Sequence, residues 1–164
     1  MKAKQRSIRK LGYALAVAMV VTPVGAGQAQ QSVKTMAPVS SGEMLRIARL
    51  FGSAAISRQK NGDPLIAGAI NHIPYALRFL NCANRDACED INFRVGFQVK
   101  PSIDVINAWN ASKRFSRAYL DGEGDAILEM DVVINGGVST EMLNSSFEYW
   151  RLSLNQFVKH IGFQ

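Results

Sequence analysis

The chain has 164 residues, 19 of them basic and 13 acidic, which gives a formal charge of +6. Five of the basic residues stand within the first ten positions, and without them the count is 14 basic against 13 acidic residues, a net charge of +1. That balance removes the main support for nucleic-acid binding. The remaining length, about 120 residues after an amino-terminal lead, is enough for one domain with one hydrophobic core.

Residues 1–29 have the layout of a secretory signal peptide. A basic segment precedes an apolar run from Leu11 to Val21, and small residues lead up to Ala29. The apolar run is well short of the roughly 20 residues that are needed to span a bilayer. We therefore predict cleavage near Ala29, a periplasmic or secreted mature protein, and no stable membrane anchor after cleavage.

Residues 30–41 are polar and without periodicity, so we expect a flexible linker there. The folded domain is predicted for residues 42–164. Its first helix is expected to begin around Ser41 and to end at Gly52, because apolar residues recur between them at helical spacing. Those residues are Met44, Ile47, Ala48 and Phe51.

Several strands are predicted in the middle of the chain. Two short strand-like runs flank Asn61-Gly62, a dipeptide suited to a tight hairpin. A third strand should start at Pro74, where a missing N–H group is tolerated. The clearest strand runs from Ile91 to Val99, because apolar and polar residues alternate strictly along it.

The second half of the domain is predicted to hold a helix, a hairpin and a long helix. The short helix begins after Ser102 and carries Ile103, Ile106 and Trp109 on one side. The hairpin strands cover residues 115–120 and 126–134. The final helix, capped by Ser139 or Thr140, carries one apolar stripe made by Leu143, Phe147, Trp150, Leu154, Phe157 and Ile161. This order of elements predicts an α+β domain, an antiparallel sheet covered by helices.

Cys82 and Cys88 are the only cysteines in the chain. Their spacing fits neither paired zinc ligands nor a redox pair with two intervening residues. A disulfide needs an oxidising compartment, which the signal peptide predicts, and close Cα atoms, which two strands of a hairpin provide. We therefore predict a structural disulfide between them.

The sequence offers no pattern for catalysis, a cofactor or a metal. The acidic loop from Asp121 to Asp125 is not followed by the glycine and glutamate of an EF-hand, since Ala126 and Val132 stand at those positions. No serine and acid stand at triad spacing from either histidine. We expect a non-enzymatic protein without a cofactor.

These segments together resemble the YbjN family of bacterial proteins. The resemblance rests on Tyr75-x-x-x-Phe79 before Cys82, on Cys88 with INFRVGF, on INAWN, on RFSRAYLDGEGDAILEMDV, and on Gly136-Gly137 before the last helix. It covers about Glu43 to Ile161. The resemblance implies a fold like that of type III secretion chaperones and a label as a sensory transduction regulator. It brings no established catalytic residues.

Candidate partner-binding residues flank the short helix and the adjoining hairpin: Asn107, Asn110, Arg114, Arg117 and Tyr119. They combine amide donors, guanidinium groups and an aromatic ring, which often anchor protein contacts. The asparagines either cap the helix end or face a groove. Arg117 is also expected opposite Glu129 across the hairpin, as an ion pair.

We therefore expect an exported binding or regulatory module of the bacterial cell envelope that engages a protein or peptide partner. Homodimerisation stays open. Two alternatives are a small-molecule sensor domain with an internal pocket and an enzyme with an unrecognised site. A grooved apolar surface favours the first function, a closed apolar pocket the second, and a deep polar pocket with converging carboxylates the third.

Overall fold

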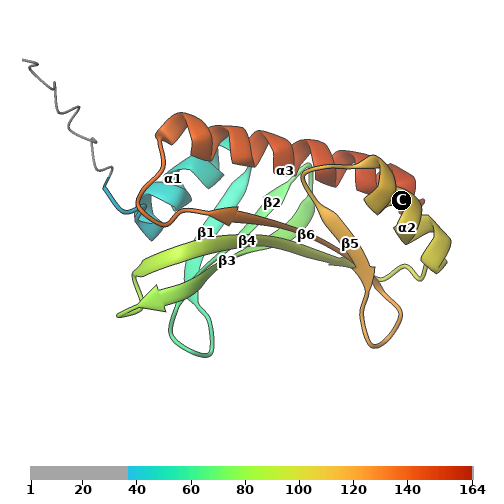
Figure 1. Ribbon diagram of the computed structural model, residues 1–164, viewed down its shortest axis with the longest axis horizontal. Helices are drawn as coiled ribbons and strands as arrows, with labels where there is room; N and C mark the ends of the chain where they lie inside the picture. The colour runs from blue at the N-terminus through green and yellow to red at the C-terminus, as the bar shows by residue number, and fades with distance from the viewer. Residues whose placement is uncertain (1–36, 164) are drawn as a thin grey trace, which may run out of the picture. The chain divides into compact units, whose positions relative to one another are not determined.

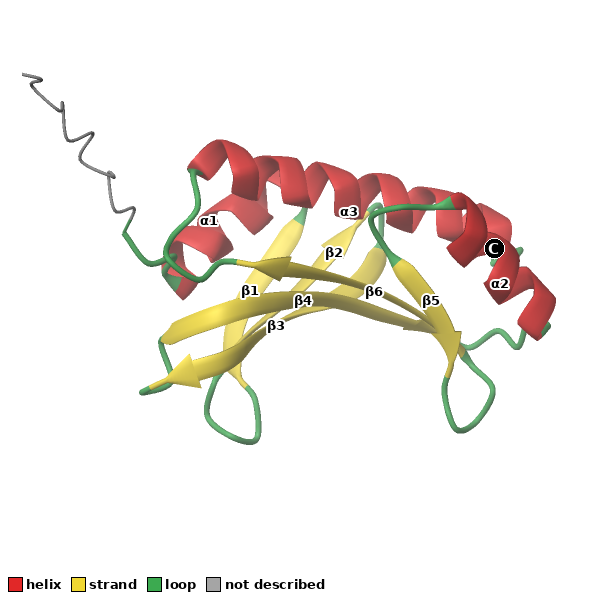
Figure 2. Cartoon of the chain, in the orientation of Figure 1, coloured by secondary structure: helices red, strands yellow, loops and turns green. Residues whose placement is uncertain are grey.

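The computed structural model describes residues 37–163, which form one sheet with helices on one of its faces (Figures 1 and 2). In chain order the elements are α1 (Ser41–Phe51), β1 (Ser53–Arg58), β2 (Pro64–Ile70), β3 (Ile73–Ala83), β4 (Ala87–Phe97), α2 (Ile103–Ser112), β5 (Arg117–Leu120), β6 (Ala126–Val133) and α3 (Thr140–His160). The predicted signal peptide lies outside the described residues.

All strand pairs of the six-stranded sheet are antiparallel, and the strand order is β1-β2-β3-β4-β6-β5. This confirms the predicted α+β class. The further likeness to type III secretion chaperones stays a prediction. Within the described residues, none of the helices combines the length and hydrophobicity required to cross a bilayer.

A serine directly precedes each of the three helices in the described residues. The hydroxyl groups of Ser40, Ser102 and Ser139 accept a hydrogen bond from the backbone N–H three residues further on. These caps satisfy N–H groups that have no partner inside the helix. Val39, just before the first cap, is buried in the core. The folded part therefore begins a few residues before the predicted boundary at Gly42.

The core lies between the sheet and the helices, and aromatic rings fill its centre. Phe93 of β4 stacks on Trp150 of α3 at 5.4 Å between ring centroids and meets Phe147 edge to face at 5.0 Å. Every member of the predicted stripe of α3 is buried. Ile103 was expected on the buried side of α2, but it is exposed, because this first residue of α2 precedes the turns that pack.

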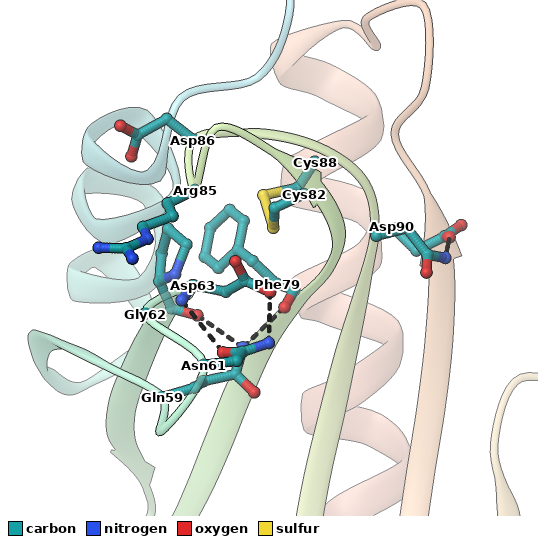
Figure 3. The surroundings of a disulfide bond; sticks show 12 residues. Gln59, Asn61, Gly62, Asp63, Phe79, Cys82, Arg85, Asp86, Cys88 and Asp90 are labelled. Atoms are coloured by element: carbon teal, nitrogen blue, oxygen red, sulfur yellow. Dashed lines mark hydrogen bonds between the residues drawn. A yellow bond between two sulfur atoms is a disulfide. The ribbon is translucent and has the colours of Figure 1, made fainter.

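Cys82 and Cys88 form a disulfide across the β3–β4 hairpin, close to its turn (Figure 3). The two residues are direct partners in the strand register, and their Cα atoms are 3.8 Å apart. The guanidinium group of Arg58 on β1 donates to the carbonyl of Arg85 in this turn. The disulfide therefore closes a hairpin end that also contacts Arg58 of β1, on the far side of β2.

Replacing both cysteines by serine is expected to lower stability without changing the fold. The closed loop is short, so the chain-entropy model gives a loss of about 2–2.5 kcal/mol. Thermal melts of the oxidised protein, the reduced protein and the double variant measure this loss. The reduced protein and the variant should melt at similar temperatures. Equal melting temperatures for all three forms would contradict the stabilising role.

Candidate functional site

Glu129 is the centre of a polar cluster on the face of the sheet opposite the helices. Its neighbours on β6, Leu128 and Met130, belong to the core, so Glu129 points to the other face. Its side chain is only 3% exposed, although no helix of the described chain covers this face. Neighbouring side chains cover it instead: Arg78, Arg94, Arg117 and Tyr119.

The strand register explains how three arginines reach one carboxylate. Arg94 on β4 and Arg117 on β5 are the direct partners of Glu129 on its two sides. Arg78 is the β3 partner of Asn92, one row further along. Its Nη2 donates to the Asn92 amide oxygen at 2.7 Å and lies 3.4 Å from Glu129 Oε1. The Asn92 amide nitrogen in turn donates to Asp131.

These contacts use both oxygens of the carboxylate. Glu129 Oε1 accepts hydrogen bonds from Arg94 and from the Tyr119 hydroxyl, and Oε2 accepts from Arg117 Nη2 at 2.8 Å. Burial alone would raise the pKa of Glu129, but the hydrogen bonds from Tyr119 and Arg94 and the positive charges outweigh it and hold that pKa below its ordinary value. Burial, followed by the contact with Glu129, raises the pKa of Tyr119. The cluster therefore keeps an ionised carboxylate beneath a layer of guanidinium groups.

A second feature, the free edge of β6, lies next to this cluster. β5 is four residues long and pairs only with Ala126–Glu129, whereas β6 continues to Val133. The N–H of Ile134 bonds to the carbonyl of Glu89 on the β4 side, so the backbone groups of Asp131 and Val133 point the other way. Within the described residues, no strand and no backbone hydrogen bond meets them there.

Exposed apolar side chains line a groove between this edge and α3. The groove has a volume of about 320 Å³ and includes Phe115, Val133, Met142 and Tyr149, each of which is exposed. The ring of Phe115 stacks on that of Tyr149 at 4.0 Å between centroids, with the planes 9° apart. This pair joins the loop before β5 to α3 and forms one wall of the groove.

A polar groove of about 310 Å³ continues from the apolar one, and both are lined by Phe115, Met130 and Asp131. Its other lining residues include Lys113, Arg114 and Arg117. It forms where the chain before β5 diverges from β6. The free edge thus has an apolar groove at one end and a basic groove at the other.

The residues predicted from the sequence are placed unevenly around these features. Arg117 and Tyr119 both contact Glu129, and the predicted pairing of Arg117 with Glu129 is confirmed. Arg114 lines the polar groove, with its guanidinium group over the ring of Phe115. Asn107 is exposed on α2 and is not among the lining residues of either groove. Their role in partner binding stays a prediction.

Asn110 is among the lining residues of the polar groove, one of the two alternatives expected of it, but its amide group is bound to the backbone of β5. Its amide oxygen accepts from the backbone N–H of Ala118, and its amide nitrogen donates to the carbonyl of the same residue, at 2.8 and 2.9 Å. The side chain therefore occupies the outer edge of β5 as a neighbouring strand would, and it joins α2 to the sheet. The outer edge of β5 is closed here, which leaves the β6 edge as the free one on this side.

Sequence reasoning missed Arg78, Arg94, Phe115, Met142 and Tyr149. A signal was present for Arg94, because it alternates with the core residues of the clearest strand and so had to face outward. The other four residues reach the cluster or the grooves only through the tertiary structure, which decides which strands are neighbours and where β5 begins.

The acidic loop between β5 and β6 is a turn that satisfies its own backbone. Asp121 Oδ1 accepts hydrogen bonds from the N–H groups of Glu123 and Asp125. Lys100 donates to the carbonyl of Glu123. Among residues 37–163, no group of three or more His, Cys, Asp or Glu side chains is placed to hold a metal ion.

A family comparison matches most of the chain. The sequence model of the YbjN family, described as "Putative bacterial sensory transduction regulator", matches residues 46–163. The match includes the whole sheet, the Glu129 cluster and both grooves. No curated protein matches the chain significantly.

Proposed function

The chain belongs to the YbjN family, and from that premise we propose that it is a regulatory binding module that engages an extended segment of a partner protein along the free edge of β6. The observation that carries the proposal is the edge itself. Asp131 and Val133 present backbone groups that no other backbone group of residues 37–163 binds, beside an apolar groove. An added strand gains backbone hydrogen bonds from such an edge and specificity from the adjoining pockets.

The charges beside the edge favour an acidic partner. Three basic residues, Lys113, Arg114 and Arg117, line the polar groove, whereas of its two carboxylates Glu129 is neutralised by its arginines and Asp131 accepts from the Asn92 amide. A partner segment with an acidic residue at one end and apolar residues at the other could place its acidic end in the polar groove and its apolar end in the apolar groove. Electrostatic complementarity of this kind increases association rates and selects partners.

A second copy of the chain is a poorer match for the same edge. Two β6 strands paired antiparallel about Val132 would place Asp131 of each copy opposite Val133 of the other, so the basic groove of each copy would face the apolar end of the other edge. Charged groups placed against an apolar surface lose hydration without gaining a partner. We therefore propose a partner of different sequence. The homodimer is an outcome that the oligomeric state in solution would reveal.

Both alternative functions have less support. A sensor pocket between sheet and helices would need space that Phe93, Phe147 and Trp150 occupy. The family is described as a regulator and not as an enzyme family. The signal-peptide layout and the disulfide support a place for the interaction in the cell envelope.

Ten-residue peptides selected from a displayed library against the purified protein provide the test. Val133→Pro removes an N–H on the free edge, where proline does not disturb the β4 pairing. Its loss of one backbone hydrogen bond, about 1–1.5 kcal/mol, should weaken binding of the selected peptides about tenfold. The matched control, Val133→Thr, keeps the N–H and should bind like the wild type.

Tyr149→Ala should also weaken peptide binding, because it removes one wall of the apolar groove. Titration calorimetry gives the affinities, and thermal melts show whether each variant is folded. We expect the selected peptides to carry an acidic residue followed by apolar ones. Equal affinities for wild type, Val133→Pro and Tyr149→Ala would refute the edge as the binding site.

A further inference from the structure

We propose that the arginine cluster around Glu129 is a binding site for a phosphate-class oxyanion on the open face of the sheet. This goes beyond the proposed peptide function and uses a different surface, although Arg117 borders both. The first argument is burial. Glu129 lies on the face that no helix of the described residues covers and is still only 3% exposed, so the side chains that contact it form the layer above it. This part of the sheet therefore presents the guanidinium groups of its arginines to solvent.

The second argument is that these guanidinium groups have donors to spare. Within the described chain, Arg94 donates only through Nη1 and Arg117 only through Nη2, which leaves two of the nitrogens in each group without a protein acceptor. Arg78 donates through Nε and Nη2, which leaves Nη1. The side chains of these residues are 34% (Arg78), 32% (Arg94) and 66% (Arg117) exposed, so a ligand can reach them.

The third argument is the charge balance. Three guanidinium groups contact a single carboxylate, because all three lie within 3.4 Å of Glu129. The next carboxylate, Asp131, is linked to Arg78 only through Asn92. The contacting groups therefore keep positive charge after Glu129 is neutralised. The positive charges are in place before an anion binds, so the electrostatic potential at this surface favours anion binding.

Space for the anion lies beside Arg94. An open depression of about 270 Å³ is lined by Arg94, the one arginine of the cluster among its lining residues, together with Pro74, Ala76 and Gly96. Ala76 is the direct β3 partner of Arg94, and Gly96 is the next outward-facing residue of β4. Because these side chains are small, they leave space next to the guanidinium group of Arg94. A ligand can reach that group through this space.

The arrangement favours a tetrahedral oxyanion over a carboxylate. Guanidinium groups bind carboxylates and phosphates through paired N–H donors. Here the spare donors belong to three separate groups that contact the same carboxylate, and a phosphate has enough oxygens to accept from each group. A carboxylate has two oxygens and satisfies fewer of them. The ligand class we assign is thus inorganic phosphate or a phosphate monoester.

Thermal melts in inorganic phosphate test the site. At tenfold excess over its dissociation constant, phosphate should raise the melting temperature by about 3–6 °C relative to sodium chloride of equal ionic strength. Arg117→Gln and Arg78→Gln should each lose most of this shift. Arg117→Lys keeps the charge but not the paired donors, so it should lose part of the shift. The control Arg46→Gln removes one positive charge from exposed α1, across the sheet, and should keep the shift.

The variants distinguish binding at the arginine cluster from a general stabilising effect of phosphate. Phosphate also stabilises proteins by exclusion from their surface, but that contribution is the same for all these variants. A shift that is equal in Arg117→Gln and Arg46→Gln would overturn the proposal, and so would an equal shift in acetate. Val133→Pro should keep the full phosphate shift, so that failure of the peptide function and failure of the anion site can be told apart.

Discussion

Trp150→Ala is expected to unfold the protein or leave it barely stable. The side chain is fully buried, stacks on Phe93 and meets the ring of Tyr75 edge to face at 6.2 Å. Truncating a buried tryptophan to alanine costs about 3–5 kcal/mol, because the transfer free energy is lost and a cavity remains. That is a large part of the roughly 5–15 kcal/mol that stabilises a domain. Urea unfolding followed by circular dichroism measures the loss.

Leu152→Ala is the matched control on the same helix. Leu152 is 47% exposed, on the solvent side of α3, so its truncation should change the free energy of unfolding by less than about 0.5 kcal/mol. If Trp150→Ala unfolds at nearly the same urea concentration as the wild type and Leu152→Ala, α3 does not cover the core in the way described here.

Glu129→Gln is expected to cost about 2–3 kcal/mol, since hydrogen bonds to charged groups are worth about 1.5–3 kcal/mol each and a glutamine amide replaces one acceptor by a donor. The arginines would face one another without their shared carboxylate. Partial exposure of all three screens that repulsion, which keeps the loss below that of a fully buried pair. Glu123→Gln, in the exposed turn between β5 and β6, is the control and should be nearly neutral.

The loss should depend on pH in a defined direction. The pKa of Glu129 is lower in the folded protein than its ordinary value. The stabilisation is therefore fully present above the pKa of an unfolded-chain glutamate, about 4.3, and it disappears as the pH falls through the lower folded-state pKa. The difference in unfolding free energy between wild type and Glu129→Gln should be constant near neutrality and shrink in acid. A difference that does not change between pH 7 and pH 3 would mean that the pKa of Glu129 is the same in the folded and the unfolded chain, which would contradict the stabilising contacts of its carboxylate.

Much of the fold follows from local patterns in the sequence. The stripe of α3, the alternation along β4 and the turn at Asn61-Gly62 each predicted an element that the structure contains. These predictions succeed because each pattern is set by one element packing one face against a core. The disulfide was predictable for a related reason, since two cysteines a hairpin apart have few other uses in an oxidising compartment.

The candidate sites depend on distances between strands that are far apart in sequence. Glu129 and Arg117 are paired by their hairpin, and their pairing was predicted from the turn. Arg94 joins them only because β6 inserts between β4 and β5, and Arg78 only because β3 pairs with β4 in one particular register. Exposed polar residues on a strand show which face they occupy, but not which charges on other strands they will meet.

The sequence by itself determined the fold class, the elements and the buried side of most of them, because hydrophobic periodicity is a property of each segment alone. Only the tertiary structure decided that Glu129 is buried beneath three arginines and that Asn110 closes the edge of β5. It also decided that β6 extends past β5, so that no other strand of the described residues pairs with Asp131 and Val133 on that side. These features arise from the order, register and relative lengths of neighbouring strands, and the free energy that sets them is shared among residues that no local pattern connects.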